Sequence, residues 1–126
     1  MWITLAQVAL GGAIGAALRF GAGVMILRAL GPMAFPLGVI SVNILGSFLM
    51  GFFVVLAAQK GLTAWGPFVM TGVLGGFTTF SAFSLETVTL LERGQLGLAM
   101  AYVVGSVVLS VGGLYVGVTM ARGIWA

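Results

Sequence analysis

The chain has 126 residues, of which 61% are hydrophobic and only 6% are charged. A soluble domain of this length needs many more charged residues to cover its surface. Disulfides, zinc sites and catalysis by Cys or His are excluded, because the sequence contains neither cysteine nor histidine. The net charge of +3 comes from scattered cations that form no basic patch, so nucleic acid is not an expected partner.

Three long stretches carry no charged residue at all: 29–59, 61–85 and 94–121. Each is longer than the roughly 20 apolar residues that a helix needs to cross a bilayer. The sequence therefore predicts an all-α integral membrane protein with four transmembrane helices in a single domain, 1–126. The expected spans are residues 3–28, 37–58, 66–91 and 96–121.

The first span begins without the basic residues of a cleavable signal peptide, so we expect it to be a permanent span. It carries Arg19 on a stripe of glycines. An arginine at this depth either extends to the membrane surface or neutralises a buried anion or carboxylate. We interpret Arg19 as part of an electropositive vestibule.

The second span carries Asn43, Ser47 and Gly51 at a spacing of four residues, which places them on one helical face. An amide in hydrocarbon needs several hydrogen-bond partners, because unsatisfied polar groups there are costly. Asn43 is therefore expected either to join two helices or to line a polar pathway.

The third span contains two adjacent glycines followed by Thr78 and Thr79, which are poor helix formers. We predict that this helix is broken near Gly75–Thr79. Carbonyls freed at two such breaks could surround a hard cation such as sodium. The alternative is a continuous helix with a glycine kink.

Beyond the predicted break, Phe80, Phe83 and Thr87 share one helical face, flanked by Thr79 and Glu86. The edge of an aromatic ring is electropositive and can therefore meet an anion. For Glu86, proton coupling and acceptance of hydrogen bonds are the two alternatives, and we favour the second.

The fourth span places Tyr102, Ser106 and Ser110 on one face. Each serine hydroxyl either donates back to the carbonyl four residues earlier or faces a polar pathway.

The positive charges are balanced across the predicted membrane. Lys60 and Arg122 fall on one side, and Arg28 and Arg93 fall on the other. Because the Lys/Arg imbalance of short loops sets orientation, balance favours insertion in both orientations. Opposite copies could then pair about a two-fold axis in the membrane plane, unless other features fix one orientation. Glycine spacings suited to close helix packing are expected to serve mostly within one subunit. An oligomer is expected because four helices are too few to enclose a polar pathway and some surface is left over for a partner.

Two motifs resemble those of the CrcB/Fluc fluoride channels. The first is Gly75-Gly76-Phe77-Thr78-Thr79-Phe80-Ser81-Ala82-Phe83-Ser84, and the second is the segment 38–46 around Asn43. The resemblance implies an antiparallel, dual-topology homodimer in the inner membrane, with two pores that export toxic fluoride passively. Ala82 stands where many members have threonine, which excludes a hydroxyl role at that position.

The resemblance also implies roles for individual residues. Asn43 would donate to fluoride near the mouth of the pore, and Phe80 and Phe83 would turn their ring edges toward the anion. The backbone carbonyls of Gly75 and Thr78 from both subunits would hold a sodium ion at the dimer interface. The other residues implied along the fluoride pathway are Arg19, Thr79, Ser81, Glu86, Tyr102, Ser106 and Ser110.

Three other functions fit the sequence less well. A small multidrug antiporter needs a carboxylate in its first span, where this chain has only Arg19. A noncatalytic assembly subunit would not need Asn43, the broken span and the paired phenylalanines together. An enzyme is not expected, because no nucleophile–base pair is visible.

Overall fold

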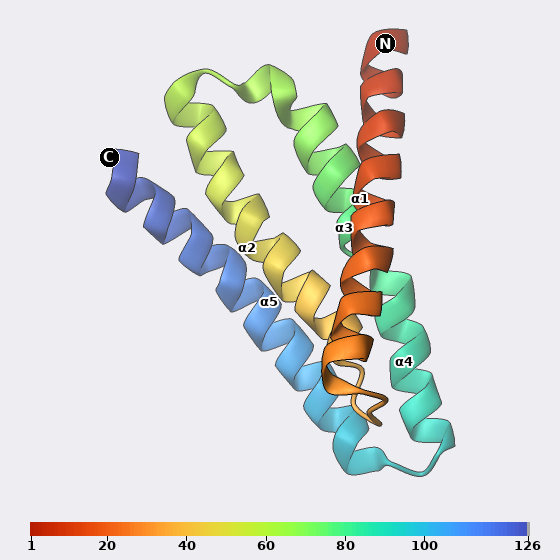
Figure 1. The fold of residues 1–126 in the computed structure, drawn as a ribbon. Coiled ribbons are helices and arrows are strands. Elements are labelled where there is room, and N and C mark those ends of the chain that lie inside the picture. Colours follow the sequence, from red (N-terminus) through yellow and green to blue (C-terminus); the bar gives the residue numbers. More distant parts are fainter. Residues whose placement is uncertain (126) are drawn as a thin grey trace.

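The computed structural model describes the backbone of residues 1–125 and the side chains of residues 1–124. All its regular structure is helical within this range (Figure 1). In chain order the elements are α1 (Trp2–Leu30), α2 (Leu37–Lys60), the 3-10 turn η1 (Thr63–Trp65), the π-helical η2 (Pro67–Leu74), α3 (Gly75–Phe77), α4 (Phe80–Glu92) and α5 (Leu96–Trp125).

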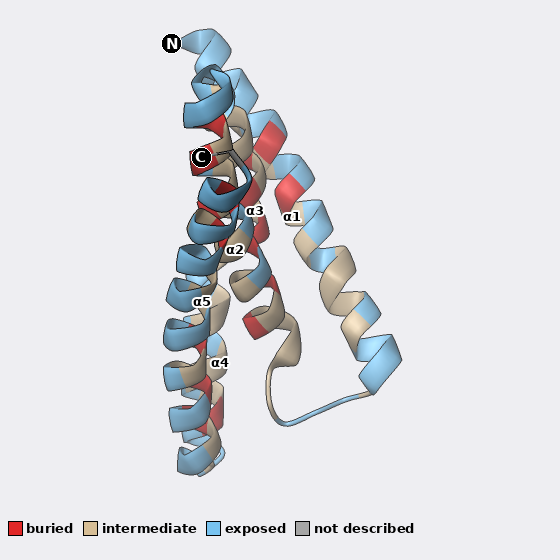
Figure 2. Cartoon of the chain, turned by 90° about the vertical axis from the view of Figure 1, so that its left-hand side faces the viewer, coloured by how far each residue is buried: buried red, intermediate tan, exposed pale blue. Residues whose placement is uncertain are grey.

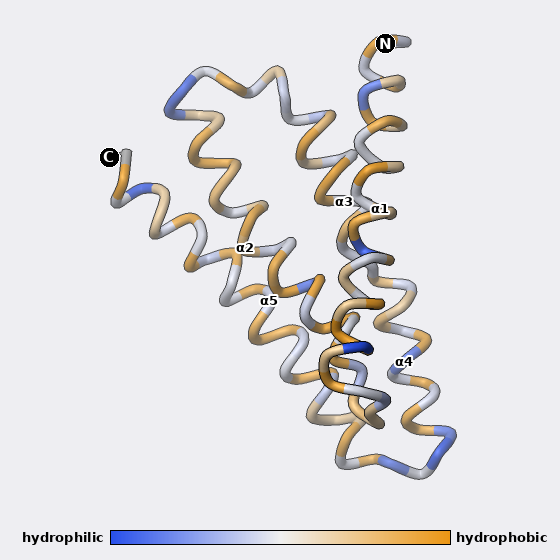
Figure 3. The backbone as a smooth tube through the Cα atoms, viewed as in Figure 1, coloured by the Kyte–Doolittle hydropathy of each residue, from blue (hydrophilic) through white to orange (hydrophobic). Residues whose placement is uncertain are grey.

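Four helical stretches in the described range are long and apolar enough to cross a membrane. Hydrophobic residues follow the helices, and the hydrophilic ones gather mainly at the turns and helix ends (Figure 3). The prediction of an all-helical protein with four spans is therefore confirmed, and the chain is a multi-pass membrane protein. The stretches are Trp2–Leu30, Leu37–Lys60, Thr63–Glu92 and Leu96–Ile124.

Helices α2 and α5 pack closely because glycines, which have no side chain, lie where the two backbones meet. A Cβ atom added at Gly51 would collide with the Leu114 carbonyl oxygen, and one added at Gly117 would collide with the Phe48 carbonyl oxygen. In lipid, where hydrophobic attraction between helices is absent, such close backbone approach supplies the packing energy.

Helix α1 packs against η2 and α3 in the same manner. A Cβ atom at Gly15 would collide with the Val73 carbonyl oxygen and lie 2.8 Å from the Phe77 backbone nitrogen. One at Gly72 would lie 2.9 Å from the Gly11 Cα. Toward its C-terminal end, α1 diverges from the other helices (Figure 2).

The third span is interrupted by two residues in extended conformation. Helix α3 ends at Phe77, and Thr78 and Thr79 then adopt φ, ψ angles of −87°, 158° and −152°, 119°. Helix α4 begins at Phe80 with Thr79 as its N-cap, whose hydroxyl oxygen accepts from the Ala82 N–H at 3.1 Å. We call Thr78–Thr79 the central interruption.

Most apolar side chains of the four spans lie exposed on the surface of the single chain (Figure 2). A small buried core near the α4–α5 turn consists of Ile40, Leu90, Ala99 and Tyr102. Exposed apolar faces of this extent suit a lipid or protein environment rather than water.

Candidate functional site

A groove of about 320 Å³ opens beside the central interruption, between α2, α4 and α5. It brings together predicted residues from three spans that are far apart in the sequence. We call it the central groove. Its lining residues are Asn43, Ser47, Thr78, Thr79, Phe80, Phe83, Ser106, Val107, Ser110 and Val111.

The Asn43 side chain forms two hydrogen bonds with the Thr79 backbone. Its Oδ1 accepts from the Thr79 N–H at 2.8 Å, and its Nδ2 donates to the Thr79 carbonyl oxygen at 3.1 Å. Asn43 therefore joins two spans, which is one of the two alternatives drawn from the sequence, and its side chain also lines the groove. A primary amide carries two N–H groups, which leaves one that can donate to a ligand.

The central interruption removes helical donors from several mid-span carbonyls, including those of Gly75 and Thr78. In a continuous helix the Thr79 N–H would donate to the Gly75 carbonyl and the Ala82 N–H to the Thr78 carbonyl. Here the first donates to Asn43 Oδ1 and the second to Thr79 Oγ1. The Gly75 and Thr78 oxygens are thus freed as acceptors, which is the ligand type that a hard cation prefers.

Arg19 approaches the interruption from α1. Its Nε donates to the Gly76 carbonyl oxygen at 3.0 Å, and its side chain lines a cavity of about 130 Å³ together with Thr79 and Ala82. Sequence reasoning did not anticipate a backbone carbonyl as the partner of this arginine. The contact fixes the Gly76 peptide next to the interruption.

Three hydroxyls along one face of α5 are buried without a hydrogen-bond partner among the described residues. They belong to Tyr102, Ser106 and Ser110. Back-bonding to the i−4 carbonyl, the alternative considered for the serines, does not occur here. It does occur for Thr78, Ser84, Thr87, Thr89 and Thr119. Because buried polar groups normally have partners, this face of α5 is suited to a ligand.

Phenylalanine rings cover one side of the central groove. Phe80 is 79% exposed despite its position in the middle of a span, and Phe83 packs beside it with ring centroids 5.4 Å apart. Ser81 lies at the rim, where its Oγ is 3.2 Å from Thr79 Oγ1, and it is absent from the groove lining. Phe83 contacts both Phe80 and Tyr102, with the ring planes tilted by 43° and 33°.

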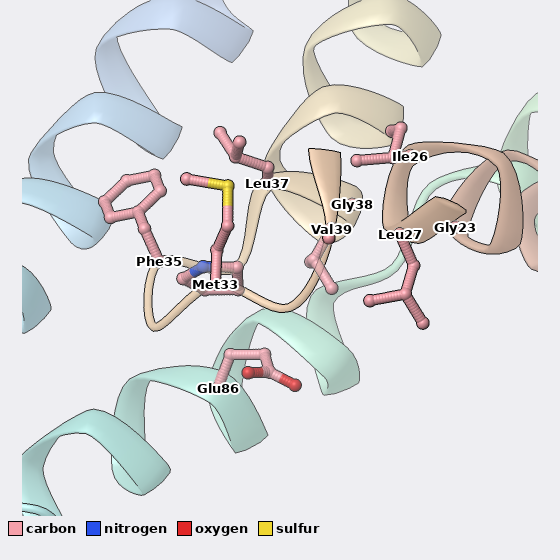
Figure 4. A pocket seen from close by; sticks show the side chains of 11 residues that line it. Gly23, Ile26, Leu27, Met33, Phe35, Leu37, Gly38, Val39 and Glu86 are labelled. Carbon is pink, nitrogen blue, oxygen red and sulfur yellow. The ribbon is translucent and has the colours of Figure 1, made fainter. Parts of the chain in front are cut away.

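Glu86 lies in a second cavity of about 270 Å³ rather than in the central groove. We call it the end cavity. It is lined by residues of α1, the 31–36 loop, α2 and α4, and Glu86 is the one charged residue among them (Figure 4). Phe35 also lines it, a residue that sequence reasoning missed. The only signal for Phe35 was an aromatic residue immediately before a proline.

Comparison with known proteins places these features in a family. Residues 6–118 match the family described as CrcB-like protein, Camphor Resistance (CrcB). A protein of Ruegeria sp. (strain TM1040), named fluoride-specific ion channel FluC, is 65% identical over 98% of both chains. Proteins with the same name from Roseobacter denitrificans and Agrobacterium fabrum are 61% and 46% identical, covering 97–98% of this chain and 98–99% of theirs. The chain therefore belongs to the CrcB-like family.

Proposed function

We propose that this chain forms a passive, fluoride-selective ion channel of the bacterial inner membrane, which lets toxic fluoride leave the cell down its electrochemical gradient. The relatives' names support this function. The observation that carries it is the central groove, where the Asn43 amide, two phenylalanine rings and the unpartnered hydroxyls of Ser106 and Ser110 lie together.

The groove suits fluoride because it offers donors in place of water. Removing the water shell of a small, strongly hydrated anion costs on the order of tens of kcal/mol unless other hydrogen-bond donors replace the water. The free N–H of Asn43, the serine hydroxyls and the ring edges together supply positive ends of dipoles to the anion. Chloride is larger and forms weaker hydrogen bonds, so it recovers less of its hydration energy there. The groove lining includes no cationic side chain that would trap an anion.

We propose further that two copies pair antiparallel and close two such pores. Three observations support a partner: the 79% exposure of Phe80, the apolar faces left open on the spans, and the balanced cations. Both termini lie at the same end of the subunit (Figure 1), with Lys60 and Arg122 toward that end and Arg28 and Arg93 toward the other.

A sodium ion at the dimer interface is the third part of the proposal. The Gly75 and Thr78 carbonyls, freed by the central interruption, fit such an ion from each subunit. Bound there, sodium would supply positive potential near the pores. It would also hold the two interruptions together, so these backbone oxygens would have a structural role.

Replacing sodium on both sides of the membrane with N-methylglucamine is expected to stop fluoride efflux and to lower the melting temperature of the purified protein. Thr78→Ser is the matched control. It keeps the backbone carbonyl and a hydroxyl that can donate to Leu74 O, so it should retain the same sodium dependence. Unchanged efflux and stability without sodium would contradict the cation site.

The decisive test of the function uses vesicles that contain purified protein and are loaded with potassium fluoride or potassium chloride, with sodium present in the solutions on both sides of the membrane. After valinomycin is added, an ion-selective electrode should record rapid fluoride release. Chloride release should not exceed that of protein-free vesicles. Equal release of both anions, or release of neither, would refute the proposed channel.

A further inference from the structure

Phe35 lies in the loop between α1 and α2, where the local sequence fixes its position. Gly31 turns the chain with a positive φ of 76°, and Pro36 caps α2. A residue before proline is restricted to extended conformations, which limits the directions its side chain can take. The Leu37 N–H also donates to the Phe35 carbonyl oxygen at 2.9 Å. Figure 4 shows the ring directed from the loop toward α5.

Phe35 completes a continuous line of four aromatic rings. The Phe80 and Phe83 centroids lie 5.4 Å apart, Phe83 and Tyr102 5.3 Å apart, and Tyr102 and Phe35 5.6 Å apart. The last pair is nearly perpendicular, at 85°. All three spacings fall in the range where rings attract each other. We call this set the aromatic line.

The aromatic line connects the two cavities of the subunit. Phe80 and Phe83 line the central groove, and Phe35 lines the end cavity beside Glu86. Tyr102 lies between them, in ring contact with both Phe83 and Phe35, and it is completely buried. The aromatic line therefore places Tyr102 between rings that line the two cavities.

The Tyr102 hydroxyl has no hydrogen-bond partner among the described residues, so nothing polar anchors this end of the ring. Its orientation depends on packing alone, from the core residues Ile40, Leu90 and Ala99 and from the rings on either side. Phe83 lies on one side, in tilted contact, and Phe35 holds the ring edge-to-face from the loop. Loss of Phe35 would remove the ring that packs against Tyr102 from the side of the end cavity.

We propose that Phe35 is a positioning residue for permeation: it holds Tyr102, with its free hydroxyl, between the rings that line the central groove and the end cavity. The inference rests on the proposed fluoride channel. It assigns the loop before α2 a role in the conduction path, although the loop lies outside the spanning helices.

The test compares fluoride efflux from vesicles containing wild-type protein, Phe35→Leu, Phe35→Trp and Phe68→Leu. Phe35→Leu keeps an apolar side chain but loses the ring, and it should slow efflux roughly tenfold, the upper range for one lost ring pair. Phe35→Trp restores a ring and should recover most of the rate. Phe68→Leu is the matched control, because it removes an edge-on contact with Trp65 that lies outside the aromatic line.

A second measurement separates positioning from packing. If Phe35 acts through the Tyr102 hydroxyl, Tyr102→Phe should also slow efflux, and the double variant with Phe35→Leu should be no slower than the slower single variant. Should Phe35→Leu fail to assemble, Phe35→Tyr and Phe35→Met provide the same comparison of ring against no ring.

The outcomes distinguish this inference from the channel itself. Wild-type efflux from Phe35→Leu, or equal slowing by Phe35→Leu and Phe35→Trp, would overturn the role of Phe35 while the channel stands. Independent, multiplicative effects of the two substitutions would overturn positioning through Tyr102. Wild-type vesicles that release no fluoride would instead refute the proposed function.

Discussion

Asn43→Asp is expected to reduce fluoride efflux by about 100-fold, because a donor that faces the anion becomes a negatively charged acceptor, at a cost on the order of 3 kcal/mol. The same change removes the hydrogen bond from Nδ2 to the Thr79 carbonyl and places two oxygens against each other there. Efflux from vesicles, measured with a fluoride electrode, gives the result directly.

Asn43→Ala is the companion variant, because it removes both contacts with Thr79 without adding charge. We expect it to conduct poorly but better than Asn43→Asp. Size-exclusion profiles must match the wild type for the comparison to report on permeation. Efflux at the wild-type rate from Asn43→Asp would contradict a donor role for this amide.

Gly15→Ala is expected to destabilise the folded protein by on the order of 1–3 kcal/mol, which is typical of overpacking. The added methyl group would collide with the Val73 carbonyl oxygen and lie 2.8 Å from the Phe77 nitrogen. These are backbone atoms, so α1 must separate from the third span to accommodate it. The fraction of protein that stays monodisperse after heating in detergent measures the loss.

Gly12→Ala is the matched control on the same helix, since a Cβ atom at Gly12 meets nothing within 4 Å in the subunit. Alanine is favoured over glycine inside a helix by roughly 0.5–1 kcal/mol, so this variant should be at least as stable as the wild type. Equal heat resistance of the two variants would show that close packing at Gly15 is unimportant.

These glycine contacts also bear on function, because Phe77 is the last residue before the central interruption. The backbone of α1 touches the third span at Val73 and Phe77, and Arg19 then reaches the Gly76 carbonyl one turn further along α1. The interruption is thus held from α1 on one side and by Asn43 from α2 on the other.

The sequence alone was sufficient for the four spans, and it also named most of the residues that line the central groove. A single long apolar stretch can satisfy its backbone hydrogen bonds in lipid only as a helix. The positions of the helices can therefore be predicted without tertiary information. The sequence also predicts that Tyr102, Ser106 and Ser110 lie on one face of their helix, because helical periodicity determines which residues share a face.

Other site features depend on contacts between residues far apart in the chain. Sequence spacing could not show that Asn43 would pair with the Thr79 backbone, 36 positions away, or that Arg19 would bond to the Gly76 carbonyl, 57 positions away. It also gave no reason to link Phe35 with Tyr102, because a ring-to-ring contact from a loop follows no periodicity.

Thus the sequence by itself determined that the chain crosses the membrane as four helices, because hydrocarbon leaves a long apolar segment no other way to satisfy its backbone. Only the tertiary structure decided which polar groups are satisfied and which remain free. The diverted donors of Thr79 and Ala82 and the unpartnered hydroxyls of α5 arise from how the helices meet. A hydrogen bond depends on the positions of both partners, and a sequence gives only their order.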